Sequence, residues 1–240
     1  MRAWVQFFDS AHTIYVNARH RDVHFRRIAE DIAPYVPSRT ATVLDFGCGE
    51  ALHADVVAEA AGHLILAEAA PGVRARIAER FRDVSRIEAR STDDVAGMPD
   101  GSIDLLVMHS VSQYLTSDQL DGLLRTFRRL LKPGGTLLLG DVVPPYVSPM
   151  VDALALLRFG AREGFLGAAL VGLLRTVFSD YRRLRSSMGL ARYDETTILH
   201  KLAAAGFAAK RAAANLGHNP ARMTFIATPR PADGEALAAE

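Results

Sequence analysis

Short apolar runs alternate with longer amphipathic stretches along the middle of the chain. Strand-like runs cover residues 41–46, 63–68, 85–89, 105–108 and 136–140. Helical spacing of apolar residues covers Ala51–Ala61, Val73–Phe81 and Asp118–Leu131. Leu105–Met108 is apolar throughout, which is typical of a strand buried on both faces of a parallel sheet. The pattern therefore predicts an α/β protein in which helices cover both faces of a mostly parallel sheet.

The two ends of the chain add further elements. Residues 1–36 show helical spacing, which Pro34 and Pro37 bring to an end. Near the other end, a helix is predicted at Glu195–Ala204, before two strands at Lys210–Ala214 and Met223–Thr228. Residues 229–240 are rich in Pro, Ala and Glu, which predicts a frayed tail.

Residues 142–192 do not fit the alternating pattern. Met150–Phe159 and Gly164–Phe178 are strongly apolar, and three arginines follow them, Arg182, Arg183 and Arg185. Neither run reaches the ~20 apolar residues that a membrane span needs. At least half of the segment is expected to pack on the core. For the rest, three roles stay open: a lid over an apolar substrate, a helix facing a partner or a second copy in a homodimer, or a peripheral membrane contact.

Composition narrows the classes of function. The 240 residues are 49% hydrophobic, so residues 1–240 are expected to form one domain with an insertion. A net charge of +1 gives no electrostatic case for nucleic-acid binding. The single cysteine, Cys48, excludes an internal disulfide framework and fits a reducing, cytoplasmic setting. Met1–Ser10 carries no long apolar run behind a basic start, so no signal peptide is expected.

The most informative stretch is the turn after the first strand, Val43-Leu44-Asp45-Phe46-Gly47-Cys48-Gly49-Glu50. Gly47 and Gly49 can take positive φ, so the backbone can lie against a ligand. The helix expected to follow points unpaired N–H groups at the same place. Leu52 stands where a dinucleotide-binding G-x-G-x-x-G motif has its third glycine. The Asp45 carboxylate would repel a pyrophosphate but suits a ligand with cationic or hydroxyl donors.

Glu68 ends the second strand-like run, 19 residues after Gly49. An acid about 20 residues past a glycine turn is placed to accept hydrogen bonds from both hydroxyls of a ribose. One carboxylate with two acceptor oxygens matches two vicinal hydroxyl donors. We therefore expect Glu68 to bind a nucleoside.

Two later segments complete a set of motifs. Residues 99–104 read Pro-Asp-Gly-Ser-Ile-Asp, and residues 131–135 read Leu-Lys-Pro-Gly-Gly before an apolar strand. Together with Asp45-x-Gly47-x-Gly49 and Glu68, in this order, they resemble class I S-adenosylmethionine-dependent methyltransferases. The resemblance covers residues 41–141 closely and 193–228 more loosely. It implies a Rossmann-like, seven-stranded, mostly parallel sheet, an N-terminal helical cap over residues 1–38 and a lid-like helical insertion over residues 142–192.

The resemblance also implies S-adenosylmethionine as cofactor, and it assigns a set of binding residues by their motifs. The set comprises Asp45, Phe46, Gly47, Cys48, Gly49, Glu68, Ala69, Thr92, Asp93, His109 and Ser110. Thr92 stands where the family usually has the aspartate that bonds to the adenine, and Asp93 comes one position later. Either side chain can accept a hydrogen bond from an exocyclic amine, so both stay candidates. Cys48 is expected to be a small residue that fits the turn rather than a nucleophile.

Candidates on the substrate side are fewer. The resemblance suggests Tyr15, Arg19, His20 and His24 of the N-terminal segment as pocket residues, and His218 from the loop between the last two strands. Asp141, at the end of the fifth strand, contacts the substrate or only caps a loop. If the acceptor loses a proton, His109 is the first candidate base and His24 the second. No metal is expected, because His20 and His24 lack a third ligand at the right spacing.

The sequence therefore predicts a methyltransferase that acts on a small-molecule or lipid-like acceptor. The alternative is a non-catalytic S-adenosylmethionine-binding protein that docks on another subunit or on a membrane. A nicotinamide-dependent dehydrogenase is disfavoured by Asp45 and by the missing third glycine.

Overall fold

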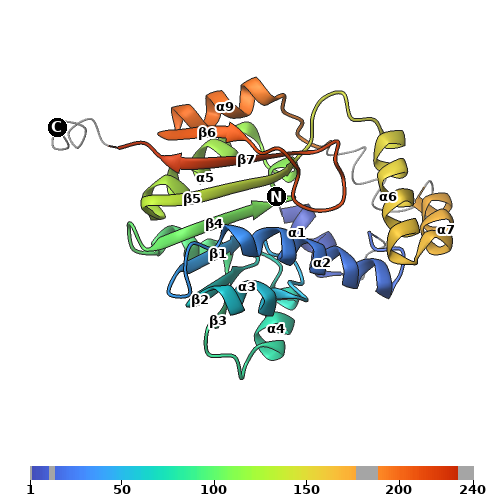
Figure 1. Ribbon diagram of the computed structural model, residues 1–240, viewed down its shortest axis with the longest axis horizontal. Helices are drawn as coiled ribbons and strands as arrows, with labels where there is room; N and C mark the ends of the chain where they lie inside the picture. Colours follow the sequence, from blue (N-terminus) through green and yellow to red (C-terminus); the bar gives the residue numbers. More distant parts are fainter. Residues whose placement is uncertain (1, 11–13, 177–188, 232–240) are drawn as a thin grey trace.

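A computed structural model describes residues 2–10, 14–176 and 189–231. Phe178, the three arginines at 182–185 and residues 232–240 of the tail lie outside these ranges. The chain forms a seven-stranded sheet with the order β3-β2-β1-β4-β5-β7-β6 (Figure 1). The strands are β1 (Thr42–Phe46), β2 (His63–Ala67), β3 (Ile87–Arg90), β4 (Ile103–His109), β5 (Leu131–Val142), β6 (Phe207–Arg211) and β7 (Met223–Pro229). Only β7 runs antiparallel to its neighbours, as the family resemblance implies.

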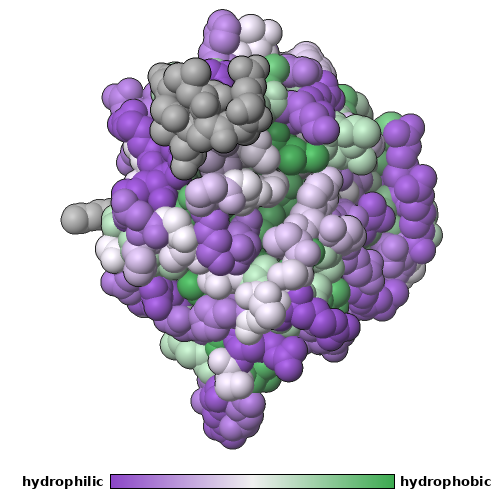
Figure 2. All heavy atoms as spheres, turned by 60° about the vertical axis from the view of Figure 1, so that its left-hand side comes forward, coloured by the Kyte–Doolittle hydropathy of each residue, from purple (hydrophilic) through white to green (hydrophobic). Residues whose placement is uncertain are grey.

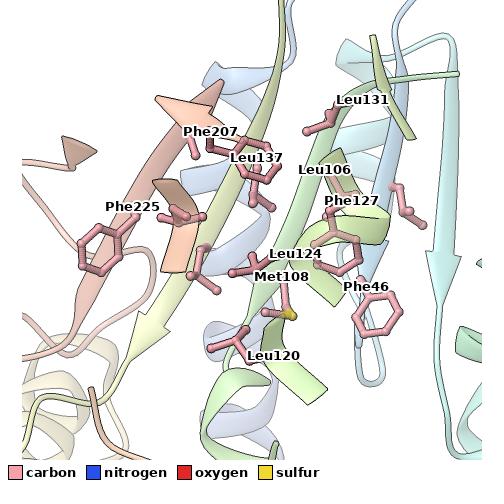
Figure 3. Packing of buried hydrophobic residues seen from close by; sticks show 14 of the residues in the cluster. Phe46, Leu106, Met108, Leu120, Leu124, Phe127, Leu131, Leu137, Phe207 and Phe225 are labelled. Carbon is pink, nitrogen blue, oxygen red and sulfur yellow. The ribbon is translucent and has the colours of Figure 1, made fainter. Parts of the chain in front are cut away.

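Helices cover both faces of the sheet, because successive side chains of each strand point to opposite sides. On one face, α5 (Ser117–Leu130) and α9 (Glu195–Ala204) pack against strand residues such as Leu106 and Phe225 (Figure 3). On the other, α2 (Ala18–Ile32), α3 (Ala54–Ala60) and α4 (Pro71–Arg80) pack against residues such as Leu105 and Leu138. The α/β prediction is therefore confirmed.

The N-terminal helices are fastened to the loops that follow the parallel strands. α1 (Arg2–Asp9) ends in Asp9, whose Oδ1 accepts the N–H groups of Gly72 and Val73 at the start of α4 (2.7 and 3.1 Å). From α2, Asp22 bonds to His53 (2.8 Å), and Asp31 accepts the N–H of Gly217 (2.8 Å). These contacts bring residues of the first 32 positions over the carboxyl ends of the strands.

Two helices follow β5, where the sequence departs from the alternating pattern. α6 (Pro149–Glu163) and α7 (Leu166–Thr176) lie side by side at the end of the molecule next to α2 (Figure 1). Gly164, with φ +79°, makes the turn between them. A small cluster of Val23, Phe159, Phe165 and Ala169 joins the pair to α2.

Several predicted boundaries are wrong, and three of them have a clear physical reason. The first helix begins at Ala54 rather than Ala51, because Ala51 (φ +44°) still belongs to the glycine turn. The fifth strand begins at Leu131, since the chain pairs with β4 through the Pro-Gly turn. The sixth begins at Phe207 rather than Lys210, because Phe207 pairs with Pro229 directly after Gly206 (φ +86°).

Candidate functional site

A cavity of about 820 Å³ lies beyond the carboxyl ends of β1, β2 and β4, where ligands bind in open α/β sheets. It is lined by all the residues predicted for the cofactor, namely Asp45, Phe46, Gly47, Cys48, Gly49, Glu68, Ala69, Thr92, Asp93, His109 and Ser110. It is also lined by Tyr15, His20, His24, Asp141 and His218. Arg19 is the exception: it lies outside, half exposed, and donates to the carbonyl of Glu163 (3.0 Å).

The glycine turn is held tightly against its neighbours. Gly47 and Gly49 have φ of +75° and +59°, conformations that other residues adopt at a cost. A Cβ on Gly47 would lie 2.4 Å from Cγ2 of Val111, and one on Gly49 would lie 3.5 Å from the ring of Phe25. The turn is therefore packed against Val111 on one side and against Phe25 of α2 on the other.

Glu68 is buried beside this turn. Its Oε2 accepts the N–H of Gly49 (2.9 Å) and its Oε1 accepts the N–H of Ala70 (2.8 Å). Burial raises the pKa of the carboxyl above its usual range, and the backbone donors oppose that shift. A carboxylate has about four acceptor positions, so capacity remains for a ligand hydroxyl.

Asp45 and Cys48 lie on the same side of the cavity. Burial and the nearby charge of Glu68 raise the pKa of Asp45 to about 7. Burial raises the pKa of the Cys48 thiol well above its usual value, so this residue stays protonated and unreactive.

The ends of β4 and β5 meet in a strained pair of residues. Ser110 and Asp141 are cross-strand neighbours, since His109 pairs with Gly140, and both have left-handed φ (+57° and +58°). The hydroxyl of Ser110 donates to Asp141. Such conformations in residues other than glycine gather at functional sites.

His109 is held by a backbone carbonyl. Its Nε2 lies 3.2 Å from the oxygen of Leu216, and because a carbonyl only accepts, Nε2 carries the ring proton. The Nδ1 atom is then the unprotonated nitrogen. Gly140 leaves room for the ring, since a Cβ there would lie 2.9 Å from Cδ2 of His109.

A polar network that the sequence did not reveal continues from Asp141. Arg222 donates from Nη2 to both oxygens of Asp152 (2.9 Å each) and from Nη1 to Gln113 (3.2 Å). It also lies 3.9 Å from Asp141. Asp152 was visible as an isolated acid in an apolar helix, but nothing local pairs it with an arginine 70 positions away.

The far end of the cavity is rich in aromatic rings. His218 stacks on Phe159 (ring centroids 4.6 Å apart) and His20 stacks on Phe165 (4.8 Å). Burial lowers the pKa of His20 to about 4, and burial with the nearby His218 lowers the pKa of His24 well below its usual value. These imidazoles are therefore neutral near pH 7. Within the described ranges, no group of three or more His, Cys, Asp or Glu residues is arranged to hold a metal ion.

Thr92 and Asp93 both lie at the cavity wall in the 3-10 helix Thr92–Gly97. Thr92 is partly buried and Asp93 is exposed. The side chain of Ser91 caps this helix by accepting the N–H of Asp93 (3.3 Å). Which of the two contacts an adenine stays a prediction.

Comparison with known proteins agrees with the resemblance found in the sequence. Residues 44–139 match the family model described as a methyltransferase domain. Chondramide synthase cmdD of Chondromyces crocatus is 38% identical over 97 residues, which cover 33% of this chain. The matched part is 2% of that protein, so the chain spans only a small fraction of this relative's length.

Solved structures share the fold. YcgJ of Bacillus subtilis superposes with a TM-score of 0.58 at 13% identity, covering 86% of this chain and 100% of that one. The mitomycin 7-O-methyltransferase MmcR gives 0.59 at 20% identity, over 87% of this chain and 54% of that one. A putative S-adenosylmethionine-dependent methyltransferase of Methanococcus maripaludis gives 0.58 at 15% identity, over 88% of both chains.

Proposed function

Since the chain is a class I S-adenosylmethionine-dependent methyltransferase, we propose that it methylates a small or lipid-like acceptor bound at the aromatic end of its cavity. One observation supports this most strongly. A single cavity joins the glycine turn and Glu68 to a far end built of aromatic rings and neutral imidazoles. An apolar acceptor can therefore pack against these rings beside the nucleoside, while Asp152 and Arg222 at the cavity wall are paired with each other.

The residues of the chain fit the cofactor. Gly47 and Gly49 hold the positive φ that shapes the turn at the cavity wall, and Glu68 retains acceptor capacity for its ribose. Asp45 offers a carboxylate to its cationic groups. When bound, S-adenosylmethionine supplies an electrophilic methyl group on sulfur, so the protein's main contribution is to orient the acceptor and exclude water.

His109 is the proposed base for an acceptor that starts as a hydroxyl. Its unprotonated Nδ1 follows from the bond between Nε2 and Leu216. His24, which burial keeps neutral, is the second candidate. The proposal also includes one domain over residues 1–240 in a cytoplasmic setting, with residues 1–38 as a cap and 142–192 as a lid.

Calorimetry with S-adenosylhomocysteine and with NAD tests the proposal first. We expect the nucleoside thioether to bind and NAD not to bind. Incubation with S-adenosylmethionine and panels of phenols, amphiphilic alcohols and amines, followed by mass spectrometry, should then show a product heavier by one methylene. Cofactor binding without any methylated product would favour the alternative, a non-catalytic binding protein.

Replacing Glu68 with alanine is expected to weaken S-adenosylhomocysteine binding by about 10- to 100-fold, since hydrogen bonds to charged groups contribute roughly 1.5–3 kcal/mol. The change also leaves the N–H groups of Gly49 and Ala70 without their acceptor, which lowers the melting temperature. Calorimetry and thermal unfolding measure the two effects. Glu88→Ala, on β3 outside the cavity, is the matched control and should retain full affinity.

The affinity for S-adenosylmethionine is expected to rise with pH up to about 7. Without ligand, Asp45 is protonated below its pKa of about 7, and a cationic ligand favours the carboxylate. Binding at lower pH must therefore displace a proton, which costs affinity. Calorimetry across this range should show the rise, and Asp45→Asn should flatten it. Asp55→Asn, exposed on α3, should leave it in place.

A further inference from the structure

The outward face of α7 is apolar. Leu166, Leu170, Val171 and Leu174 are exposed, and their spacing of three to four residues places them along one side of the helix. Leu174 is 73% exposed. Contiguous exposed apolar surface of this kind marks a site of interaction.

The outward face of α6 continues the pattern. Met150, Val151 and Leu154 are exposed on it, with Met150 at 72%. We call the exposed apolar side chains of the two helices the α6–α7 patch. Among the described residues, the remaining exposed large apolar side chains are Tyr146, just before α6, and Val84, before β3. Figure 2 brings forward the side of the molecule opposite these helices, and that surface is mostly hydrophilic.

The unpaired charges of the two helices are positive. Arg158 and Arg162 continue the exposed stripe of α6, and Arg175 continues that of α7. The acids of the pair are both engaged elsewhere: Asp152 with Arg222, and Glu163 with Arg19. An apolar stripe bordered by arginines is complementary to a lipid surface with anionic headgroups.

The inner face of the same helices closes the acceptor end of the cavity. Leu156 lines the cavity, and Phe159 and Phe165 stack on His218 and His20. The helix pair therefore separates the cavity from the α6–α7 patch. None of the helices in residues 2–10, 14–176 and 189–231 is both long and apolar enough to span a bilayer.

We propose that the α6–α7 patch docks on an anionic lipid surface, with its leucines in the interface and its arginines at the headgroups. A second copy of the chain fits less well, because the two acids of the helix pair are held by Arg222 and Arg19 and so offer no free partner to its arginines. The inference rests on the proposed function in one respect: docking would admit an amphiphilic acceptor from the bilayer to the cavity past α6 and α7.

Vesicle flotation of the full chain tests the proposal. We expect flotation with phosphatidylcholine–phosphatidylglycerol vesicles, little with phosphatidylcholine alone, and a decline as salt is added, because salt screens the arginines. The double variant Leu170→Glu/Leu174→Glu should lose flotation. Val84→Glu, which introduces one carboxylate at an exposed apolar position outside the patch, should float as the wild type does.

Two outcomes would overturn the docking proposal: wild-type protein that does not float, or a double variant that still floats. A dimer seen by analytical ultracentrifugation and dissociated by the double variant would instead assign the patch to a second copy. Calorimetry with S-adenosylhomocysteine on each variant checks that the fold is intact. Flotation without a methylated product would support docking while contradicting the proposed function, so the two can fail separately.

Discussion

Replacing Gly47 with alanine is expected to abolish detectable binding of S-adenosylhomocysteine. The new Cβ would lie 2.4 Å from Cγ2 of Val111, and the residue would have to hold φ +75°. The left-handed conformation alone costs an L-residue roughly 1–2 kcal/mol. To relieve this overlap, either the turn or Val111 has to move. We expect either shift to displace the backbone that lies beside the ligand. Calorimetry measures the loss, and circular dichroism shows whether the chain remains folded.

Two controls separate the causes. Gly134 has φ +77° but no atom near the position of a Cβ, and it lies outside the cavity. Gly134→Ala therefore carries the conformational cost without the overlap, and it should retain affinity. Adding Val111→Ala to Gly47→Ala removes the overlapping methyl group and should restore part of the binding. Unchanged affinity in Gly47→Ala would contradict the assigned role of the turn.

His109→Gln is expected to lower turnover by about 10²–10⁴, the usual contribution of a general base. The ring donates from Nε2 to Leu216, which leaves Nδ1 as a basic nitrogen, and glutamine has no basic atom. Single-turnover kinetics on the product-forming acceptor measure the change. Affinity for S-adenosylhomocysteine should change far less, so the effect appears in the rate and not in cofactor binding.

His200→Gln serves as the matched control, because His200 is exposed on α9 and outside the cavity. A pH–rate profile adds a second readout, since loss of a base removes the alkaline rise of the wild-type profile. If His109→Gln keeps full turnover while His24→Gln lowers it, the base is His24. If neither variant changes the rate, the acceptor enters the reaction already deprotonated.

Local sequence was enough for the parts of the site that lie on one strand and its turn. Asp45, Gly47, Gly49 and Glu68 could be placed because each stands at a fixed step from the end of a strand. The sheet followed for the same reason, since its strands are short apolar runs between recognisable turns. The family resemblance, rather than any local pattern, suggested that His218 in the loop between the last two strands lies at the cavity, and it does.

Polar contacts between residues far apart in the chain could not be predicted from local sequence. Arg222 and Asp152 come together because β7 inserts beside β5 and α6 follows β5, and no periodicity records that meeting. The late start of α3 was missed because Ala51 adopts a left-handed conformation, which alanine disfavours. The sequence around Ala51 therefore gives no sign of it. Arg19 was misplaced because its helix face could not be fixed without its partner, Glu163.

The left-handed backbone conformation of Ser110 and Asp141 has a consequence for engineering the thermal stability of this protein. Glycine or asparagine adopts a positive φ at a lower energetic cost than serine or aspartate. Selections for heat-tolerant variants should therefore often recover substitutions at these two positions. Such variants would relieve the backbone strain but would lose the hydrogen bond between Ser110 and Asp141 and a polar group that borders the cavity. Backbone strain and the polar border of the cavity are thus coupled at these two neighbouring residues.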